Sequence, residues 1–273
     1  MTKRDWIKYA ALFVLAVAAF GVAALALMNP RGSGESAPVA SIPAVTPAAT
    51  ATPTATSSVT ATATATASAP VQQPAIELPA EPVLLILGDS YTAGDGAGRP
   101  DQGWANLVAR QLRYPATIEG AGGTGFAWGG GAQDELDGEY ETRLRQIAAD
   151  PAFVPNLLIL QGGQNDAQIQ DADEVRTATT QTIEAARRFW PGIQVVVLGP
   201  CAPQPLAEDL RTVNSAVRAG AEAANAPFID AIEGGWFTAG NSPEFDADGA
   251  HPNAAGHAHI AEKFLESWAV LVG

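Results

Sequence analysis

The 273-residue sequence predicts an α/β fold over residues 81–273, a three-layer α/β/α sandwich with a parallel sheet. Three short aliphatic runs, at 83–88, 156–163 and 193–200, lack polar alternation, as is typical of strands that are covered on both faces. Segments with helical spacing separate these runs. Because strands alternate with helices along the chain, we expect right-handed crossovers and parallel pairing.

The first half of this region contains two predicted strands and two predicted helices. VLLILG at 83–88 predicts a buried strand, and the spacing of apolar residues in WANLVARQLR predicts a helix over 104–113. ATIEGAG at 116–122 is a weaker strand candidate. DELDGEYETRLRQIAAD predicts a helix over 134–150 that a glycine interrupts.

The second half continues the alternation. NLLILQGG at 156–163 predicts another buried strand, and the helix expected over 172–190 should stop before Pro191. IQVVVLGP at 193–200 predicts the next strand. The pattern after it predicts a helix over 206–225.

Two elements are expected at the end of the chain. PFID at 227–230 is a candidate for a short last strand. A closing helix is predicted over 253–272, with Pro252 near its first turn. His257 and His259 lie within this helix, where histidines are usually packed or partly exposed, so we expect structural roles for both.

The first 34 residues have the pattern of a membrane segment. Lys3, Arg4 and Lys8 precede an uncharged, mostly apolar run over residues 9–28. A helix of that length would cross the ~30 Å hydrocarbon layer, and basic residues before it favour a cytoplasmic N-terminus. We therefore interpret residues 1–34 as a cytoplasmic N-terminus with a transmembrane anchor; a cleaved signal peptide is the alternative. Both interpretations predict an exported folded part, which is either attached to the cell membrane or secreted.

Composition changes sharply after the apolar run. Residues 35–80 are mostly Ala, Thr, Pro, Ser and Val, which predicts a disordered stalk.

Residues 81–273 contain 11 of the 15 Lys and Arg residues and 26 of the 29 Asp and Glu residues, a net charge of −15. This acidic balance argues against nucleic acid as a partner. We expect the folded domain to be monomeric and to meet the membrane only through the N-terminal helix.

Three breaks rich in glycine and polar residues follow predicted strands. They lie at 88–90, 120–126 and 162–166. The carboxyl ends of parallel strands meet at one edge of a sheet, where ligands bind in folds of this kind. Ser90 therefore lies where a functional serine would be expected, although a helix cap is the simpler interpretation.

A serine acts as a nucleophile only when a base removes its proton, and His is the usual base. His251 lies in a loop just before the closing helix, and Asp248 is three residues upstream. Asp248 could orient one imidazole nitrogen while the other faces Ser90, as in a Ser–His–Asp triad. The alternative is that Asp248 and His251 are only turn and cap residues.

Attack on an acyl carbon also requires donors for the oxyanion that forms. Candidates are the backbone N–H of Ser90, the backbone N–H of Gly123 and the side-chain amide of Asn165. A glycine allows the backbone to approach closely. The alternatives are an Asx-turn at Asn165 and a flexible connection at 120–126.

Four motifs together resemble the SGNH, or GDSL-type, hydrolase family. They are GDSYTAG at 88–94, GGTGF at 122–126, GQND at 163–166 and DGAHPN at 248–253. They occur in the order expected of the family and span nearly the whole predicted domain. One departure is that Tyr91 stands where the name-giving pattern has Leu.

The resemblance implies a role for each candidate residue. Ser90 would be the nucleophile and first oxyanion donor, with Gly123 and Asn165 as the other donors. His251 would be the base, oriented by Asp248. Two further assignments follow: Asp89 would be a structural partner in the first turn, and Gly122 is an alternative to Gly123.

The family implies a flavodoxin-like three-layer sandwich that hydrolyses carboxylic esters without a metal or organic cofactor. Acyl or acetyl groups on small molecules, glycans or lipids are candidate substrates. An acyltransferase to cell-surface glycans and a non-catalytic wall- or glycan-binding module are the alternatives. Phe126 and Trp128, beside a glycine run, could form an aromatic wall near the site or a loose surface loop.

Overall fold

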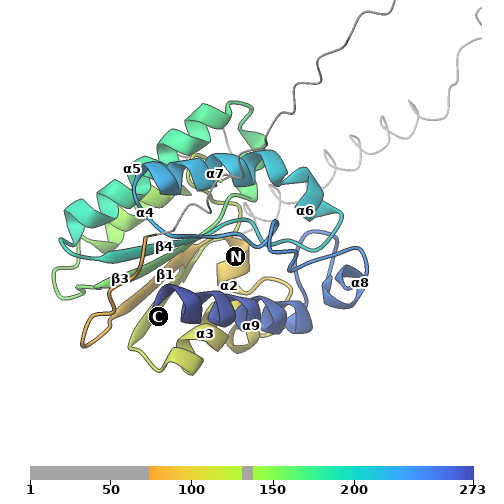
Figure 1. Cartoon of the computed structure of the whole chain (residues 1–273), viewed down its shortest axis with the longest axis horizontal. Helices are drawn as coiled ribbons and strands as arrows, with labels where there is room; N and C mark the ends of the chain where they lie inside the picture. Colours follow the sequence, from red (N-terminus) through yellow and green to blue (C-terminus); the bar gives the residue numbers. More distant parts are fainter. Residues whose placement is uncertain (1–73, 131–137) are drawn as a thin grey trace, which may run out of the picture. The chain divides into compact units, whose positions relative to one another are not determined.

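The computed structural model describes residues 74–130 and 138–273 (Figure 1). The predicted anchor over 1–34 and most of the predicted stalk lie outside the described residues. Within the described part, no helix is long and apolar enough to span a membrane. Ile76, from the last residues of the predicted stalk, is buried, and its backbone N–H donates to the carbonyl of Leu271 at 3.2 Å.

A five-stranded parallel sheet forms the centre of the domain, in the order β2-β1-β3-β4-β5. This is the flavodoxin-like order, in which the direction of winding reverses between β1 and β3. All five predicted strands are confirmed: β1 Leu84–Gly88, β2 Ala116–Gly120, β3 Leu157–Gln161, β4 Gln194–Leu198 and β5 Phe228–Ile229.

The register of the sheet aligns the segments that follow its strands. Gly88 at the end of β1 pairs with Gly120 of β2 on one side and with Gln161 of β3 on the other. The three breaks predicted to meet at one edge therefore begin at the same level of the sheet.

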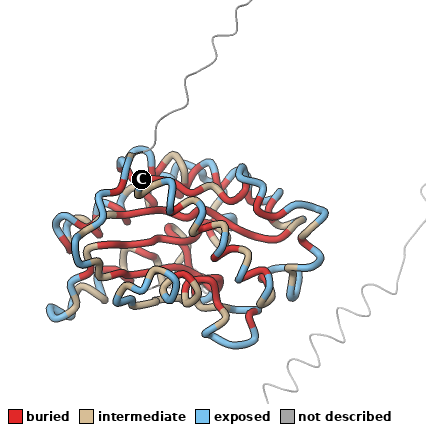
Figure 2. Tube along the Cα trace, turned by 60° about the horizontal axis from the view of Figure 1, so that its bottom comes forward, coloured by how far each residue is buried: buried red, intermediate tan, exposed pale blue. Residues whose placement is uncertain are grey.

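Helices cover both faces of the sheet (Figure 1). Helices α4, α5 and α7 pack together on one face, and α3 and α9 pack together on the other. Every residue of β1 and β3 is buried, and Figure 2 shows buried segments running through the centre of the domain. The three-layer sandwich is thus confirmed. The covering helices are α3 Trp104–Leu112, α4 Tyr140–Ile147, α5 Ala172–Phe189, α7 Arg211–Ala223 and α9 Ala254–Leu271.

Two predicted helices differ from the observed ones. The helix predicted over 134–150 is present only as α4, which begins at Tyr140 after Gly138; residues 134–137 lie outside the described part. The helix predicted over 206–225 is divided at Leu210 into α6 (Leu206–Asp209) and α7, and the buried side chain of Leu210 joins the core. Short helical turns missed by the periodicity are α2 Ser90–Ala93, α8 Ser242–Phe245, and the 3₁₀ turns Pro100–Gln102 and Asn165–Gln168.

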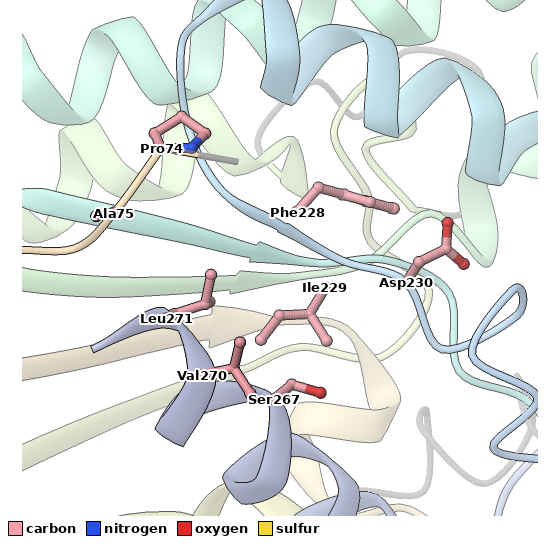
Figure 3. A pocket seen from close by; sticks show the side chains of 8 residues that line it. All are labelled: Pro74, Ala75, Phe228, Ile229, Asp230, Ser267, Val270 and Leu271. Atoms are coloured by element: carbon pink, nitrogen blue, oxygen red, sulfur yellow. The ribbon is translucent and has the colours of Figure 1, made fainter. Parts of the chain in front are cut away.

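A cavity of about 560 Å³ lies between β5 and the C-terminal end of α9 (Figure 3). Its walls are mostly apolar, and none of the candidate site residues lines it. The cavity therefore belongs to the edge of the sheet and not to the site described below. Its lining residues are Pro74, Ala75, Phe228, Ile229, Asp230, Ser267, Val270 and Leu271.

Candidate active site

Ser90 lies at the point where the central strand β1 turns into helix α2. Asp89 caps α2, because its Oδ1 accepts the backbone N–H of Tyr91 at 2.9 Å. Gly88 permits this turn: a Cβ there would lie 2.2 Å from Thr92 Oγ1 and 2.8 Å from the carbonyl oxygen of Gln161. Ser90 is consequently held at the carboxyl edge of the sheet, with 8% of its surface exposed.

The structure brings Ser90, His251 and Asp248 into one hydrogen-bonded line. Ser90 Oγ lies 3.1 Å from His251 Nε2, and His251 Nδ1 lies 3.0 Å from Asp248 Oδ2. The hydrogen bond from His251 lowers the pKa of Asp248 to about 2, so its carboxylate is ionised at neutral pH. An ionised Asp248 accepts the Nδ1 proton, which leaves Nε2 free to accept the Ser90 hydroxyl proton.

The loop that carries His251 is fixed by contacts of its own. Tyr91 Oη donates to the carbonyl of Ala250 at 2.6 Å, and the backbone N–H of His251 donates to Asp248 Oδ1 at 2.8 Å. The N-cap of α9 is Asn253, which accepts the N–H of Gly256. Asp248 therefore organises the turn and also faces the imidazole, whereas the helix cap is a different residue.

The glycine-rich segment after β2 lies directly beside Ser90. A Cβ on Gly122 would be 3.8 Å from the Cβ of Ser90. Gly123 has φ +78°, a conformation that favours glycine. Asn165 reaches the same segment, since its Nδ2 donates to the carbonyl of Thr124 at 2.9 Å. The amide group has a second N–H, so this bond does not use up its donors.

Asp166 organises the glycine-rich segment, a role that the sequence analysis missed. Its fully buried carboxylate accepts three consecutive backbone N–H groups at 2.7 to 3.1 Å. Burial raises the pKa of Asp166, and these backbone hydrogen bonds oppose the rise. The signal was available, because an acidic residue beside Asn165 follows a buried strand. The donors are the N–H groups of Phe126, Ala127 and Trp128.

Arg143 on α4 is a second residue that sequence reasoning missed. Its guanidinium donates to the carbonyls of Gly88 at 2.8 Å and Glu119 at 2.6 Å, and to Thr124 Oγ1 at 3.1 Å. It thereby joins the ends of β1 and β2 to the glycine-rich segment. Burial lowers the pKa of Arg143, although an arginine remains charged at neutral pH.

Burial also perturbs the carboxyl group of Asp89, the residue before Ser90. Complete burial raises its pKa to about 7. Gln161 is its nearest side-chain donor: the amide orientation that satisfies its neighbours places the nitrogen 3.1 Å from Asp89 Oδ1 and 2.7 Å from Thr92 Oγ1. This buried network supports the turn from beneath, as expected for a structural partner of the first turn.

The remaining candidates from the sequence have packing roles. His257 is buried and bonds the backbone of Trp104 and Asp95, and His259 stacks on a phenylalanine ring of α8. Phe126 is 1% exposed and packs against the ring of Tyr140 with centroids 4.8 Å apart, so it belongs to the core and not to an aromatic wall.

Within the described residues, no group of three or more His, Cys, Asp or Glu side chains is arranged to hold a metal ion.

A serine hydroxyl, an imidazole and a carboxylate joined in this order at the carboxyl edge of a parallel sheet define a serine hydrolase. The sequence matches the GDSL-like lipase/acylhydrolase family over residues 86–259, which include all three groups. The chain belongs to this family and is a serine ester hydrolase.

Individual relatives are similar to this chain in sequence or in fold. The chain is 30% identical to the GDSL lipase Rv0518 of Mycobacterium tuberculosis over 190 residues, which are 65% of this chain and 78% of the relative. A putative GDSL-like lipase from Bacteroides ovatus shares the fold with a TM-score of 0.52 and 18% identity, over 70% of this chain and 99% of that one. A family two carbohydrate esterase from Clostridium thermocellum, solved with cellohexaose, has a TM-score of 0.54 and 19% identity, over 72% and 64% of the two chains.

Proposed function

We propose that this protein is an extracytoplasmic serine esterase that works through an acyl-enzyme on Ser90. The observation that carries the proposal is the continuous line from Ser90 Oγ through His251 to Asp248, with distances of 3.1 and 3.0 Å. In the first step His251 Nε2 takes the hydroxyl proton while Oγ bonds to the acyl carbon. The same proton then passes to the leaving alcohol as the ester bond breaks.

The second half of the reaction regenerates the serine. His251 takes a proton from water, the hydroxide bonds to the acyl carbon, and the Ser90 Oγ leaves with the proton returned by His251. The side chains of His251 and Asp248 are 27% and 55% exposed, so water can reach the base. This openness supports hydrolysis over transfer to another alcohol.

The oxyanion of both tetrahedral intermediates needs fixed donors. We assign them to the N–H of Ser90, the N–H of Gly123 and the free N–H of the Asn165 amide. The contact of Asn165 with Thr124 at 2.9 Å supports this assignment, since it holds the amide beside the glycine-rich segment. Each such donor contributes roughly 3 kcal/mol to stabilisation of the transition state.

We infer that the substrates are acyl or acetyl esters of small molecules, glycans or lipids outside the cytoplasm. The apolar run at 9–28 and the Ala/Thr/Pro-rich stretch at 35–80 support a tethered or secreted enzyme that reaches into the cell-surface layer. The carbohydrate esterases that share the fold support glycan esters as one substrate class.

The decisive variant is Ser90→Ala in the full-length protein. With 4-nitrophenyl acetate as substrate, we expect kcat/KM to fall by about 10³-fold or more, because the nucleophile is lost. Ser215→Ala, at an exposed serine on α7, is the matched control and should retain the activity of the parent. A serine-directed fluorophosphonate should label the parent at Ser90. Equal turnover by parent and Ser90→Ala, or a label elsewhere, would contradict the proposal.

A further inference from the structure

Asp95 lies on the rim of the site, close to Ser90 and Gly122. It follows α2 and Gly94, and both of its backbone groups are bonded. Its N–H donates to the carbonyl of Ser90 at 3.0 Å, and its carbonyl lies 2.9 Å from His257 Nε2. The position of Asp95 is therefore tied to that of Ser90.

His257 supports this position from the interior. Its Nδ1 lies 3.3 Å from the backbone N–H of Trp104, which can only donate. The imidazole proton is consequently on Nε2 and is donated to the Asp95 carbonyl. His257 is fully buried, so its hydrogen bond fixes the backbone of Asp95 to α9 on the interior side. The side chain of Asp95 remains exposed at the surface.

The Asp95 carboxylate lies beside the site. A Cβ on Gly122 would be 3.6 Å from Asp95 Oδ2 and 3.8 Å from Ser90 Cβ, so both side chains flank the same glycine. On the other side, a Cβ on Gly96 would be 3.1 Å from the Cβ of His251. Asp95 thus lies on the rim between the glycine-rich segment and the histidine loop.

The Asp95 carboxylate is also uncommitted. Asp95 is exposed, and across residues 74–130 and 138–273 no hydrogen bond or ion pair reaches its side-chain oxygens. By contrast, the exposed carboxylate of Glu233 is engaged in an ion pair with Arg211. The oxygens of Asp95 are therefore available to a substrate bound at Ser90.

We propose that Asp95 is a specificity-determining residue that favours esters of uncharged, hydroxyl-rich alcohols, such as O-acetylated sugars, and disfavours esters that carry a negative charge near the scissile bond. The proposal rests on the esterase function proposed above. A carboxylate accepts charge-assisted hydrogen bonds from sugar hydroxyls, and it repels a second anion within a few ångströms.

The predicted repulsion of anionic substrates by Asp95 is tested with two acetate esters that both release a substituted phenol. Full-length parent and Asp95→Asn are compared on neutral 4-nitrophenyl acetate and anionic 4-acetoxybenzoate. We expect Asp95→Asn to raise the kcat/KM ratio of the anionic to the neutral ester by about 3- to 10-fold at low salt, and by less at about 0.5 M NaCl because salt screens the repulsion. Glu81→Gln, at an exposed residue just before β1 and thus at the opposite end of the strand from Ser90, is the matched control and should leave the ratio unchanged.

The hydrogen-bonding effect is tested with an O-acetylated methyl glucoside. Asp95→Ala should lower kcat/KM for the sugar ester by about 5-fold relative to 4-nitrophenyl acetate, and Asp95→Asn, which keeps one acceptor oxygen, should lower it less. Unchanged ratios for both ester pairs, with Ser90-dependent turnover intact, would overturn the role of Asp95 alone. Absence of Ser90-dependent turnover in the parent would overturn the esterase proposal and this inference with it.

Discussion

At the scale of residues, the neighbouring side chains of Asp89 and Ser90, in the turn after β1, face different surroundings. Ser90 is directed toward the rim and His251, whereas Asp89 is completely buried beneath the turn. The turn gains a helix cap from the Asp89 carboxylate, but burial of its charge costs stability at neutral pH. This cost can be measured.

We predict that Asp89→Asn stabilises the protein at pH 8. The pKa of Asp89 is about 7 in the folded protein against an ordinary value of 3.8, so the folded state disfavours the charged form. Asn keeps the acceptor for the N–H of Tyr91 without the charge. The free energy of unfolding should rise by about 2 kcal/mol at pH 8, and the gain should shrink as pH falls from about 7 toward 4, where the parent carboxyl is protonated when folded.

Urea unfolding of parent and variant across this pH range measures the effect. Asp150→Asn, at an exposed aspartate after α4, is the control for removal of a carboxylate. A gain that is the same at pH 4 and pH 8, or a loss of stability at pH 8, would contradict the assignment of the penalty to Asp89.

At the scale of elements, the glycine-rich segment depends on a neighbouring loop for its conformation. Three of the seven residues from Gly122 to Trp128 are glycines, so buried side chains such as that of Phe126 anchor only part of this stretch. Asp166 supplies the missing contacts through three backbone N–H groups, and Gly125 leaves room for them, since a Cβ there would lie 2.4 Å from Asp166 Oδ2. The donors proposed for the oxyanion are thus preorganised by a residue that does not face the substrate.

We predict that Asp166→Asn lowers kcat more than it raises KM. The amide nitrogen of Asn cannot accept the backbone N–H groups, so the segment loses part of its order, and with it the alignment of donors that act in the transition state. For 4-nitrophenyl acetate we expect kcat to fall by about 10- to 100-fold while KM changes by less than about 3-fold. Steady-state kinetics of parent and variant measure both constants.

The control for this prediction is Asp171→Asn, which changes an exposed cap of α5 whose Oδ1 accepts the N–H of Asp173. It should preserve both kinetic constants. An Asp166→Asn variant with unchanged kcat and a raised KM would indicate a role in binding rather than in positioning the donors.

At the scale of the whole molecule, His257 joins parts of the chain that are far apart in sequence. From α9 it bonds the N–H of Trp104 on α3 and the carbonyl of Asp95 after α2. Burial lowers the pKa of His257 below 6.5, so the folded protein holds this imidazole neutral. A proton on Nδ1 would remove the acceptor for Trp104.

We predict that His257 makes the fold sensitive to mild acid. The pKa of His257 is lowered in the folded state, so its contribution to stability is present above about pH 6.5 and is lost as pH falls below it, where the unfolded chain binds the proton more readily. His257→Gln offers an acceptor and a donor without titrating. The stability of this variant relative to the parent should therefore increase as pH falls from 7 to 5.

Thermal unfolding at pH 7, 6 and 5 provides the comparison. His259→Gln, the same substitution two residues further along α9, supplies the reference for the loss of one histidine. A difference between parent and His257→Gln that is constant over this range would show that His257 does not titrate in it.

The sequence by itself determined the layers of the fold and the positions along the chain of the candidate reacting residues. Continuous aliphatic runs specify strands buried on both faces, and their alternation with helices leaves few topologies, so all five strands were predicted. Ser90, His251 and Asp248 were singled out as candidates because their residue types and short motifs are distinctive, and the structure places them within hydrogen-bonding distance of one another. The aspartate–histidine spacing suits a single turn, which makes that pair a local property.

Only the tertiary structure decided which distant groups meet. Asp166, Arg143 and Asp95 are ordinary polar residues in the sequence. Asp166 and Arg143 bond backbone groups 20 or more positions away in the chain. Asp95 lies at a rim that the glycine-rich segment and the histidine loop form with its own loop. Such contacts depend on strand register and helix packing, which local patterns do not encode. The sequence therefore predicts the reacting groups, whereas three-dimensional packing determines what holds them in place and which substrates they meet.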